Sequence, residues 1–449
     1  MKSINPFTGK LIRDYKESSD LEVKEILKQS EWAFEDWKKI SIAKRSDILV
    51  ELGNNLEKNK NQYASLITEE MGKPVKESIA EIDKCLWVCD FYAKNAVQFL
   101  ADEIIQTDAS ESFISNDPLG TILAIMPWNF PFWQVIRFAA PTLTAGNTVL
   151  LKHAGNVSGC SLALQELFEL SGYPKGCFQS VLANHEQIEL MIENDTVKAV
   201  TLTGSENAGR KIAATAAKEL KKSVLELGGN NACIIWEDAD LDTYIDTMVK
   251  ARMQNSGQSC IAAKRFIVME NIYDEFLEKF TQKVKELKSG DPKNMDTDIG
   301  TLARKDLAEE LKEQVDKSLE KGATVHLGNT IDGTFYEPTI ILNVEPGMPL
   351  FDEEIFGPVA AIIKVTSRSE SIKMASDSKY GLGTMLFTQD VAEAKRSINT
   401  ISDGAFFINE MVKSDPRLPF GGTKSSGFGR ELSREGILEF VNKKTVYIN

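Results

Sequence analysis

A cysteine at the end of a short polar segment is the residue in this chain best placed to do chemistry. Cys260 closes the run QNSGQSC, between an expected helix over about 240–254 and the expected strand RFIVM. Substrate can reach a thiol at such a junction, whereas Cys233 lies inside the apolar run NACII. Only the thiolate is a good nucleophile, so a catalytic Cys260 needs a base, a cation or backbone amides nearby. Local sequence alone still favours a buried, inert thiol.

Two polar residues next to apolar runs are candidates to assist that thiol. Glu226 stands in SVLELGG, where a buried carboxylate is costly unless it is hydrogen-bonded or functional. Partial desolvation would tune it toward a general base. Asn129, in MPWNFP, follows a predicted strand, and its amide could donate to a developing oxyanion. The plainer alternatives are an outward-facing strand residue for Glu226 and an ordinary turn residue for Asn129.

The elements that must position these residues alternate between strands and helices. Helical spacing of apolar residues covers the N-terminal region. From Thr121 onward, short apolar runs are separated by helical segments, a pattern typical of a parallel sheet with crossover helices. In KAVTLTGSENAGRKIA, Ser205 is predicted to cap a helix whose free amides face a pyrophosphate. The predicted strands are TILAIM, TVLLK, FQSVL and KAVTLTG, followed after Gly228 by NACIIW and RFIVM.

Composition excludes several other classes of protein. The chain has 449 residues, enough for two or three domains, and a formal net charge of -14, which disfavours nucleic acid and anionic membranes as partners. Six cysteines without a CxxC pair and only three histidines disfavour a metal site. The least charged stretch, 119–151, is interrupted by prolines and polar residues, so no membrane span is expected. The N-terminus lacks a signal-peptide pattern, and a cytoplasmic location is expected.

Seven motifs occur in order along nearly the whole chain, and together they resemble the aldehyde dehydrogenase superfamily. Within it the chain is most similar to short bacterial succinate-semialdehyde dehydrogenases. The motifs are PWNFP at Asn129, LLKHA at Lys152, TGS at 203–205, LELGG at Glu226, GQSC at Cys260, EEIFGPV at Glu354 and PFGGTKSSGFGRE.

The resemblance implies an α/β fold of three parts. A Rossmann-like NAD(P)-binding domain would comprise 1–98 and 119–227, and an α/β catalytic domain would comprise 228–423. A small β oligomerisation element would be built from 99–118 and 434–449, so a homodimer or homotetramer is expected. Without a partner, the C-terminal TVYIN would be an exposed strand edge.

The resemblance also implies a role for each site residue. Cys260 would attack the aldehyde, Asn129 and the Cys260 N–H would hold the oxyanion, and Glu226 would activate the water that hydrolyses the thioester. The cofactor-binding residues would be Trp128, Lys152, Gly204, Ser205, Glu354 and Phe356.

Recognition of a substrate carboxylate would need a cation, for which arginine is well suited. Arg137 matches the position where the family places such an arginine, with a structural helix residue as the alternative. Ser414 and Arg417 are further candidates. Some relatives have a second arginine six residues before the nucleophile, and this chain has Gln254 at that position. Recognition of the substrate carboxylate must therefore differ from theirs. Their redox-partner cysteine is Ala262, which excludes that switch.

The cofactor and the substrate stay open between alternatives. NAD-preferring relatives often carry a glutamate three residues after the lysine, and here that residue is Gly155. Use of either NAD⁺ or NADP⁺ is therefore expected, with a lean to NAD⁺ because no arginine stands near Lys152. Other aldehydes (lactaldehyde, glutarate semialdehyde or an apolar aldehyde), a CoA-acylating enzyme and a catalytically idle structural relative are the alternative functions.

Overall fold

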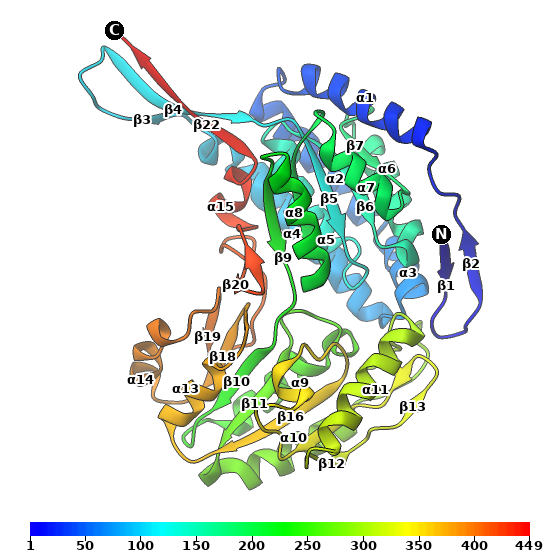
Figure 1. Ribbon diagram of the computed structural model, residues 1–449, viewed down its shortest axis with the longest axis vertical. Helices are drawn as coiled ribbons and strands as arrows, with labels where there is room; N and C mark the ends of the chain where they lie inside the picture. Colours follow the sequence, from blue (N-terminus) through cyan, green and yellow to red (C-terminus); the bar gives the residue numbers. More distant parts are fainter.

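The computed structural model describes residues 1–449, and five strands of its first large sheet come from residues 121–226 (Figure 1). Its strand order is β21-β9-β8-β5-β6-β7, parallel except for β21. The strands are β5 (Thr121–Met126), β6 (Thr148–His153), β7 (Phe178–Ser180), β8 (Val197–Thr203), β9 (Lys222–Glu226) and β21 (Gly427–Phe428). All four strands expected between 121 and 204 are present, and the chain forms the predicted crossover sheet.

Helices surround this sheet and supply much of its core. The predicted helical N-terminal region forms α1 (Asp20–Trp37), α2 (Ile42–Lys58), α3 (Lys60–Met71) and α4 (Val75–Phe99). Helix α4 packs on α5, which begins directly after the Asn129 loop. The crossover helices are α5 (Trp133–Thr144), α6 (Ser158–Leu170), α7 (His185–Glu193) and α8 (Glu206–Lys218).

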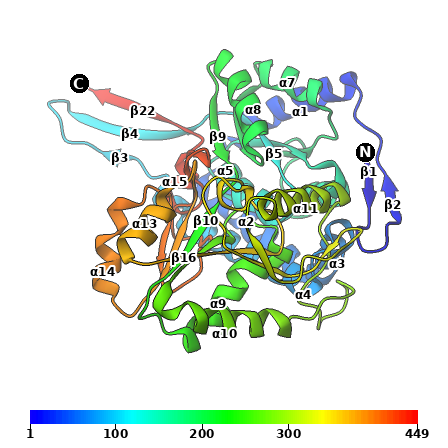
Figure 2. The same cartoon turned by 60° about the horizontal axis from the view of Figure 1, so that its bottom comes forward.

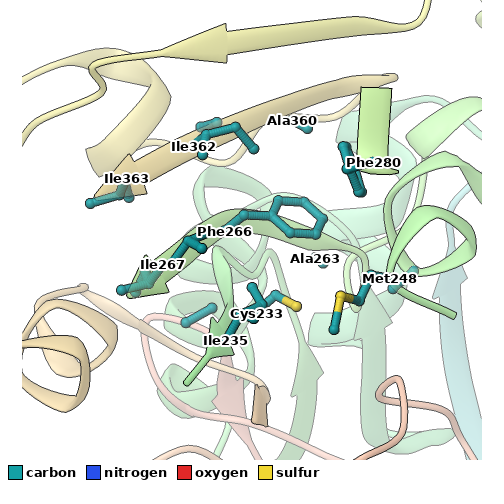
Figure 3. Packing of buried hydrophobic residues seen from close by; sticks show 14 of the residues in the cluster. Cys233, Ile235, Met248, Ala263, Phe266, Ile267, Phe280, Ala360, Ile362 and Ile363 are labelled. Atoms are coloured by element: carbon teal, nitrogen blue, oxygen red, sulfur yellow. The ribbon is translucent and has the colours of Figure 1, made fainter. Parts of the chain in front are cut away.

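A second parallel sheet follows in the chain, with the order β12-β15-β16-β11-β10-β18-β19. Only β12 is antiparallel to its neighbour. Its core includes Phe266 of β11, whose ring centroid lies 4.9 Å from that of Phe280 in the helix α10 (Tyr273–Glu286) (Figure 3). The strands are β10 (Asn231–Ile235), β11 (Ala263–Met269), β12 (Thr324–Leu327), β15 (Thr339–Leu342), β16 (Val359–Val365), β18 (Thr384–Phe387) and β19 (Phe406–Ile408).

Helices α9 and α10 lie together beside this second sheet, and α13 packs on β10 and β11 (Figure 2). The apolar stripe of each helix faces the sheet because buried residues recur at helical spacing. The bounds are α9 (Leu241–Met253), α10 (Tyr273–Glu286), α11 (Lys305–Leu319) and α13 (Arg368–Ser376). None of the helices combines the length and apolar character of a membrane span.

A third, three-stranded sheet projects away from both larger sheets (Figure 1). Strand β22 (Val441–Ile448) pairs antiparallel with β4 (Glu111–Pro118) along its whole length, and β3 (Glu103–Ile104) borders β4. The C-terminal strand thus has a partner within its own chain. Both edge strands carry exposed apolar side chains, Ile104 on β3 and Tyr447 and Ile448 on β22.

The chain passes from the first sheet to the second between Glu226, which ends β9, and Asn231, which begins β10. The predicted boundary between 227 and 228 falls in this connection. Near the C-terminus, β21 returns to the first sheet and pairs with β9. The two crossings of the chain between the sheets therefore lie close together, and the candidate site lies beside them.

Candidate active site

A cavity of about 960 Å³ opens at the junction of the two large sheets. In the first sheet β5 lies between β6 and β8, so the direction of the crossovers changes at β5. Ligands of doubly wound sheets bind at such a point, beyond the carboxyl ends of the strands. Asn129 follows β5, Gly204 follows β8, and Glu226 ends β9, so parallel pairing brings all three to the cavity.

The loop that carries Cys260 has an unusual backbone. Asn255, Ser256 and Gly257 have φ values of 56°, 51° and 74°, a left-handed conformation that costs the non-glycine residues about 1–3 kcal/mol each. The buried Arg252 guanidinium donates to the carbonyls of Gly257 (2.7 Å) and Ala263 (3.0 Å). The Asn255 amide donates to the Gln258 carbonyl at 3.0 Å. These bonds hold the loop in the shape that turns Cys260 toward the cavity.

Cys260 is the one partly exposed cysteine of the six. It lies on the wall of the large cavity and of a smaller one behind it. Burial raises the pKa of its thiol to about 11, and the nearby Lys264 charge opposes that shift. Lys264 donates to the Cys260 carbonyl at 2.6 Å and to the Ser259 carbonyl at 2.9 Å. The structure thus has a partly exposed thiol at a loop junction, where local sequence alone favoured a buried, inert one.

Glu226 is buried, with an exposed fraction of 2%, and faces the large cavity. Its Oε1 accepts no hydrogen bond. Burial, followed by the charge of Glu431, raises the pKa of its carboxyl well above the usual range. A Cβ at Gly421 would approach Oε1 to 2.7 Å, so the glycine leaves room for the carboxylate. Such a carboxyl can accept a proton at neutral pH, as a general base must.

Asn129 is fixed in one orientation by its neighbours. Its Oδ1 accepts from the Gln134 amide at 3.3 Å, and its Nδ2 donates to the Gln258 carbonyl at 3.2 Å. One Nδ2 hydrogen is therefore left without an acceptor. The Cys260 backbone N–H also donates no intramolecular hydrogen bond. Two free donors on the cavity wall are what an oxyanion hole requires.

The same cavity contains five of the six residues predicted to bind the cofactor: Trp128, Gly204, Ser205, Glu354 and Phe356. Ser205 caps α8 as predicted, with its hydroxyl accepting from the Ala208 N–H at 3.3 Å. The helix N-terminus next to Gly204 suits a pyrophosphate. Glu354 accepts from the Gly229 N–H at 3.0 Å, and the Trp128 and Phe356 rings meet edge to face at 5.7 Å. The cavity fits a dinucleotide in size and in polar groups.

Lys152, the sixth residue, lies near the carboxyl end of β6 and is not on the wall of this cavity. Burial lowers the pKa of its amine. No neighbouring charge contributes to that shift, and the residue three positions on is Gly155.

The smaller cavity, of about 110 Å³, lies on the other side of Cys260 and contains Arg137 and Ser414. Arg137 is buried on α5, and its guanidinium pairs with Glu431 at 2.5 Å and donates to the Gln134 side chain at 3.1 Å. Ser414 is also buried. Arg417 does not reach the cavity, since its exposed side chain pairs with Asp415 at 2.6 Å.

Three ionisable residues of the site were not among those expected from sequence. Lys84 lines the smaller cavity, Lys264 supports the nucleophile loop, and Glu431 pairs with Arg137. Lys264 is the second residue of the fully buried strand β11, and Lys84 lies on α4 beside the apolar Cys85 and Trp87. The apolar residues on either side of Lys264 were an available signal, whereas Lys84 follows Asp83 on an amphipathic helix and gave none.

The comparisons with known proteins agree with this geometry. The sequence pattern described as the aldehyde dehydrogenase family matches residues 1–446, and the chain belongs to that family. It is an oxidoreductase that oxidises an aldehyde with NAD(P)⁺.

Particular relatives are similar along their full length. A protein of Synechocystis sp. named as a probable NADP(+) succinate-semialdehyde dehydrogenase is 47% identical, with 99% of each chain covered. The NADP(+) succinate-semialdehyde dehydrogenase 1 of Mycobacterium bovis is 44% identical, also with 99% of each covered. The crystal structure of succinic semialdehyde dehydrogenase from Streptococcus pyogenes with NADP⁺ has a TM-score of 0.97 and 36% identity, covering 100% of this chain and 99% of that one. The expected lean to NAD⁺ finds no support in these names.

Proposed function

We propose that this enzyme oxidises succinate semialdehyde to succinate with NADP⁺. The observation that carries the proposal is the position of Cys260 on two cavities at once. The large one suits a dinucleotide. The small one has about 110 Å³, well below the roughly 300–1,000 Å³ of pockets for drug-sized ligands, and contains cations. A short aldehyde with a distal carboxylate fits both its size and its charge.

The first half-reaction uses Cys260 and the two free donors. The Lys264 charge favours the thiolate, which attacks the aldehyde carbon and forms a thiohemiacetal. The Asn129 amide and the Cys260 N–H stabilise the alkoxide that develops on the aldehyde oxygen. NADP⁺ held in the large cavity would supply the acceptor for the hydride of this carbon, and the acyl group would remain on Cys260 as a thioester.

The second half-reaction uses Glu226. Its carboxylate takes a proton from a water that attacks the thioester carbon, and the thiolate of Cys260 leaves. The raised pKa of Glu226 makes proton acceptance favourable. A CoA-acylating enzyme would need no such base, and we therefore favour hydrolysis and release of a carboxylate.

A preference for NADP⁺ is supported by the surroundings of Lys152. The lysine has no acidic partner, and Gly155 supplies no carboxylate to repel a 2′-phosphate. The names of the relatives point the same way.

The domain boundaries, the oligomer and the compartment complete the proposal. We propose a domain division at 227/228 and assign the sheet of β3, β4 and β22 to subunit contacts, because each of its edge strands is unpaired on one side and carries an exposed apolar side chain, Ile104 on β3 and Ile448 on β22. The expected assembly is a homodimer or homotetramer in the cytoplasm.

The test is a panel of kcat/KM values for succinate semialdehyde, glutarate semialdehyde, lactaldehyde and butanal, each with NAD⁺ and NADP⁺. Cys260→Ala is the blank. The proposal expects the highest kcat/KM for succinate semialdehyde with NADP⁺. A kcat/KM for butanal equal to or higher than that for succinate semialdehyde would overturn the proposed substrate. Turnover that requires CoA would overturn the proposed hydrolysis of the thioester.

A further inference from the structure

The wall of the small cavity holds more charge than one substrate arginine. Its charged residues are Glu77, Glu81, Lys84, Arg137 and Lys413. A cation that binds a substrate carboxylate strongly must not already be neutralised by an acid of the protein. The partners of these five side chains therefore decide which of them is available.

Arg137 is already paired. Its Nη2 lies 2.5 Å from a Glu431 carboxylate oxygen, and both side chains are buried. The guanidinium carbon also lies 4.7 Å from the ring centroid of Phe420. Glu431 therefore balances the charge of Arg137, and Arg137 offers a substrate hydrogen-bond donors with little net attraction. Lys413 is likewise paired with Glu410 at 2.7 Å.

The two acids of the wall are held by other groups. Glu81 pairs with Lys73 and accepts the Phe132 N–H at 2.8 Å and the Trp133 N–H at 3.0 Å. It therefore caps the N-terminus of α5 rather than neutralising Lys84.

Glu77 accepts the Asn255 N–H at 2.7 Å. The charges that act on it are Lys73, Lys76 and Lys250, and burial raises its pKa to about 7. Lys84 is not among its partners.

Lys84 is the one cation of the wall that pairs with no carboxylate. Its Nζ donates to the Ser414 hydroxyl at 2.7 Å and lies 4.5 Å from the ring centroid of Trp133. An ammonium has three donors, so two remain. Ser414 uses its oxygen as an acceptor and keeps its own hydrogen to donate. Burial and the charge of Arg137 lower the pKa of Lys84 to about 8, and the more distant charges of Glu81 and Asp415 oppose that shift without forming an ion pair.

We propose that Lys84, with the Ser414 hydroxyl beside it, binds the distal carboxylate of the substrate in the cavity next to Cys260. This inference rests on the proposed function and names the group that makes the enzyme select an acidic aldehyde. It also accounts for Gln254, since a second arginine is not needed where α4 supplies a lysine.

The test compares succinate semialdehyde with butanal, an uncharged aldehyde of equal length, in Lys84→Met and Lys84→Arg. Lys84→Met keeps the apolar stem and removes the charge. We expect it to lower kcat/KM for succinate semialdehyde by about 10- to 150-fold, the ratio for a lost charge-assisted hydrogen bond. This decrease should appear mainly as a higher KM for succinate semialdehyde, while kcat/KM for butanal stays at the wild-type value. Lys84→Arg should recover part of the kcat/KM for succinate semialdehyde.

The matched control is Lys94→Met, the same substitution on the same helix. Lys94 is exposed and pairs with Asp90, so both substrates keep their wild-type kcat/KM. Ser414→Ala is a second, milder probe that removes only the hydroxyl. It lowers kcat/KM for succinate semialdehyde alone, by about 2- to 10-fold, and it tests the inference if Lys84→Met fails to fold.

Two outcomes separate this inference from the proposed function. If wild-type enzyme does not prefer succinate semialdehyde to butanal, the proposed function fails. If the preference exists but Lys84→Met leaves it unchanged, or lowers kcat/KM for both substrates by the same factor, only the role of Lys84 is overturned.

Discussion

Replacement of Glu226 by glutamine tests the division of labour in the site most directly. Among carboxyl groups on the cavity wall, Glu226 alone is buried with an oxygen that accepts no hydrogen bond. Glutamine has nearly the same shape but cannot take a proton from water. A general base contributes about 10²- to 10⁴-fold, so hydrolysis of the thioester should slow by that factor, or about 3–5 kcal/mol.

The first turnover should survive, because Lys264 rather than Glu226 favours the Cys260 thiolate. Stopped-flow absorbance would then record a burst of about one NADPH per Cys260, followed by a slow steady state. Hydroxylamine, an external nucleophile, should restore turnover by releasing the acyl group. Glu309→Gln, an exposed change on α11, is the control and should behave as wild type.

The absence of a burst, with the first turnover slowed as much as the steady state, would refute this reasoning. Glu226 would then act on the thiol or on hydride transfer instead of on the hydrolytic water. A steady state unchanged from wild type would refute it as well.

Three further predictions follow from the same contacts. Asn129→Ala should lower kcat by about 10²- to 10³-fold with little change in KM, and an effect on KM alone would contradict its oxyanion role. Alkylation of Cys260 by iodoacetamide should accelerate about tenfold per pH unit from pH 7 to 9, because the thiolate fraction rises below a pKa of about 11; a plateau in that range would contradict the burial effect. Glu431→Gln should lower the free energy of unfolding by roughly 3–5 kcal/mol, measured in urea, because it leaves Arg137 charged and buried. The double variant Arg137→Met/Glu431→Gln should recover part of the lost free energy of unfolding, because it also removes the buried charge.

The sequence by itself determined the elements and the order of the motifs. Apolar runs such as TILAIM and KAVTLTG form β5 and β8 because alternation with helices leaves them buried on both faces. Ser205 caps α8 because its hydroxyl accepts an amide three residues on, an interaction within one short segment. Cys260, Glu226 and Asn129 were identifiable because each stands in a short motif.

Only the tertiary structure decided which charges are available to a ligand. Arg137 matched a family position, yet its partner Glu431 comes from the C-terminal segment, and no local pattern predicts that pairing. Arg417 was a candidate by its place in a loop, but Asp415 holds it outside the cavity. Lys84 was hidden in an amphipathic helix, and packing of α4 on α5 places it beside Ser414 and Trp133. Secondary structure follows from interactions between near neighbours, whereas the free charge of a buried side chain depends on distant segments that folding brings together.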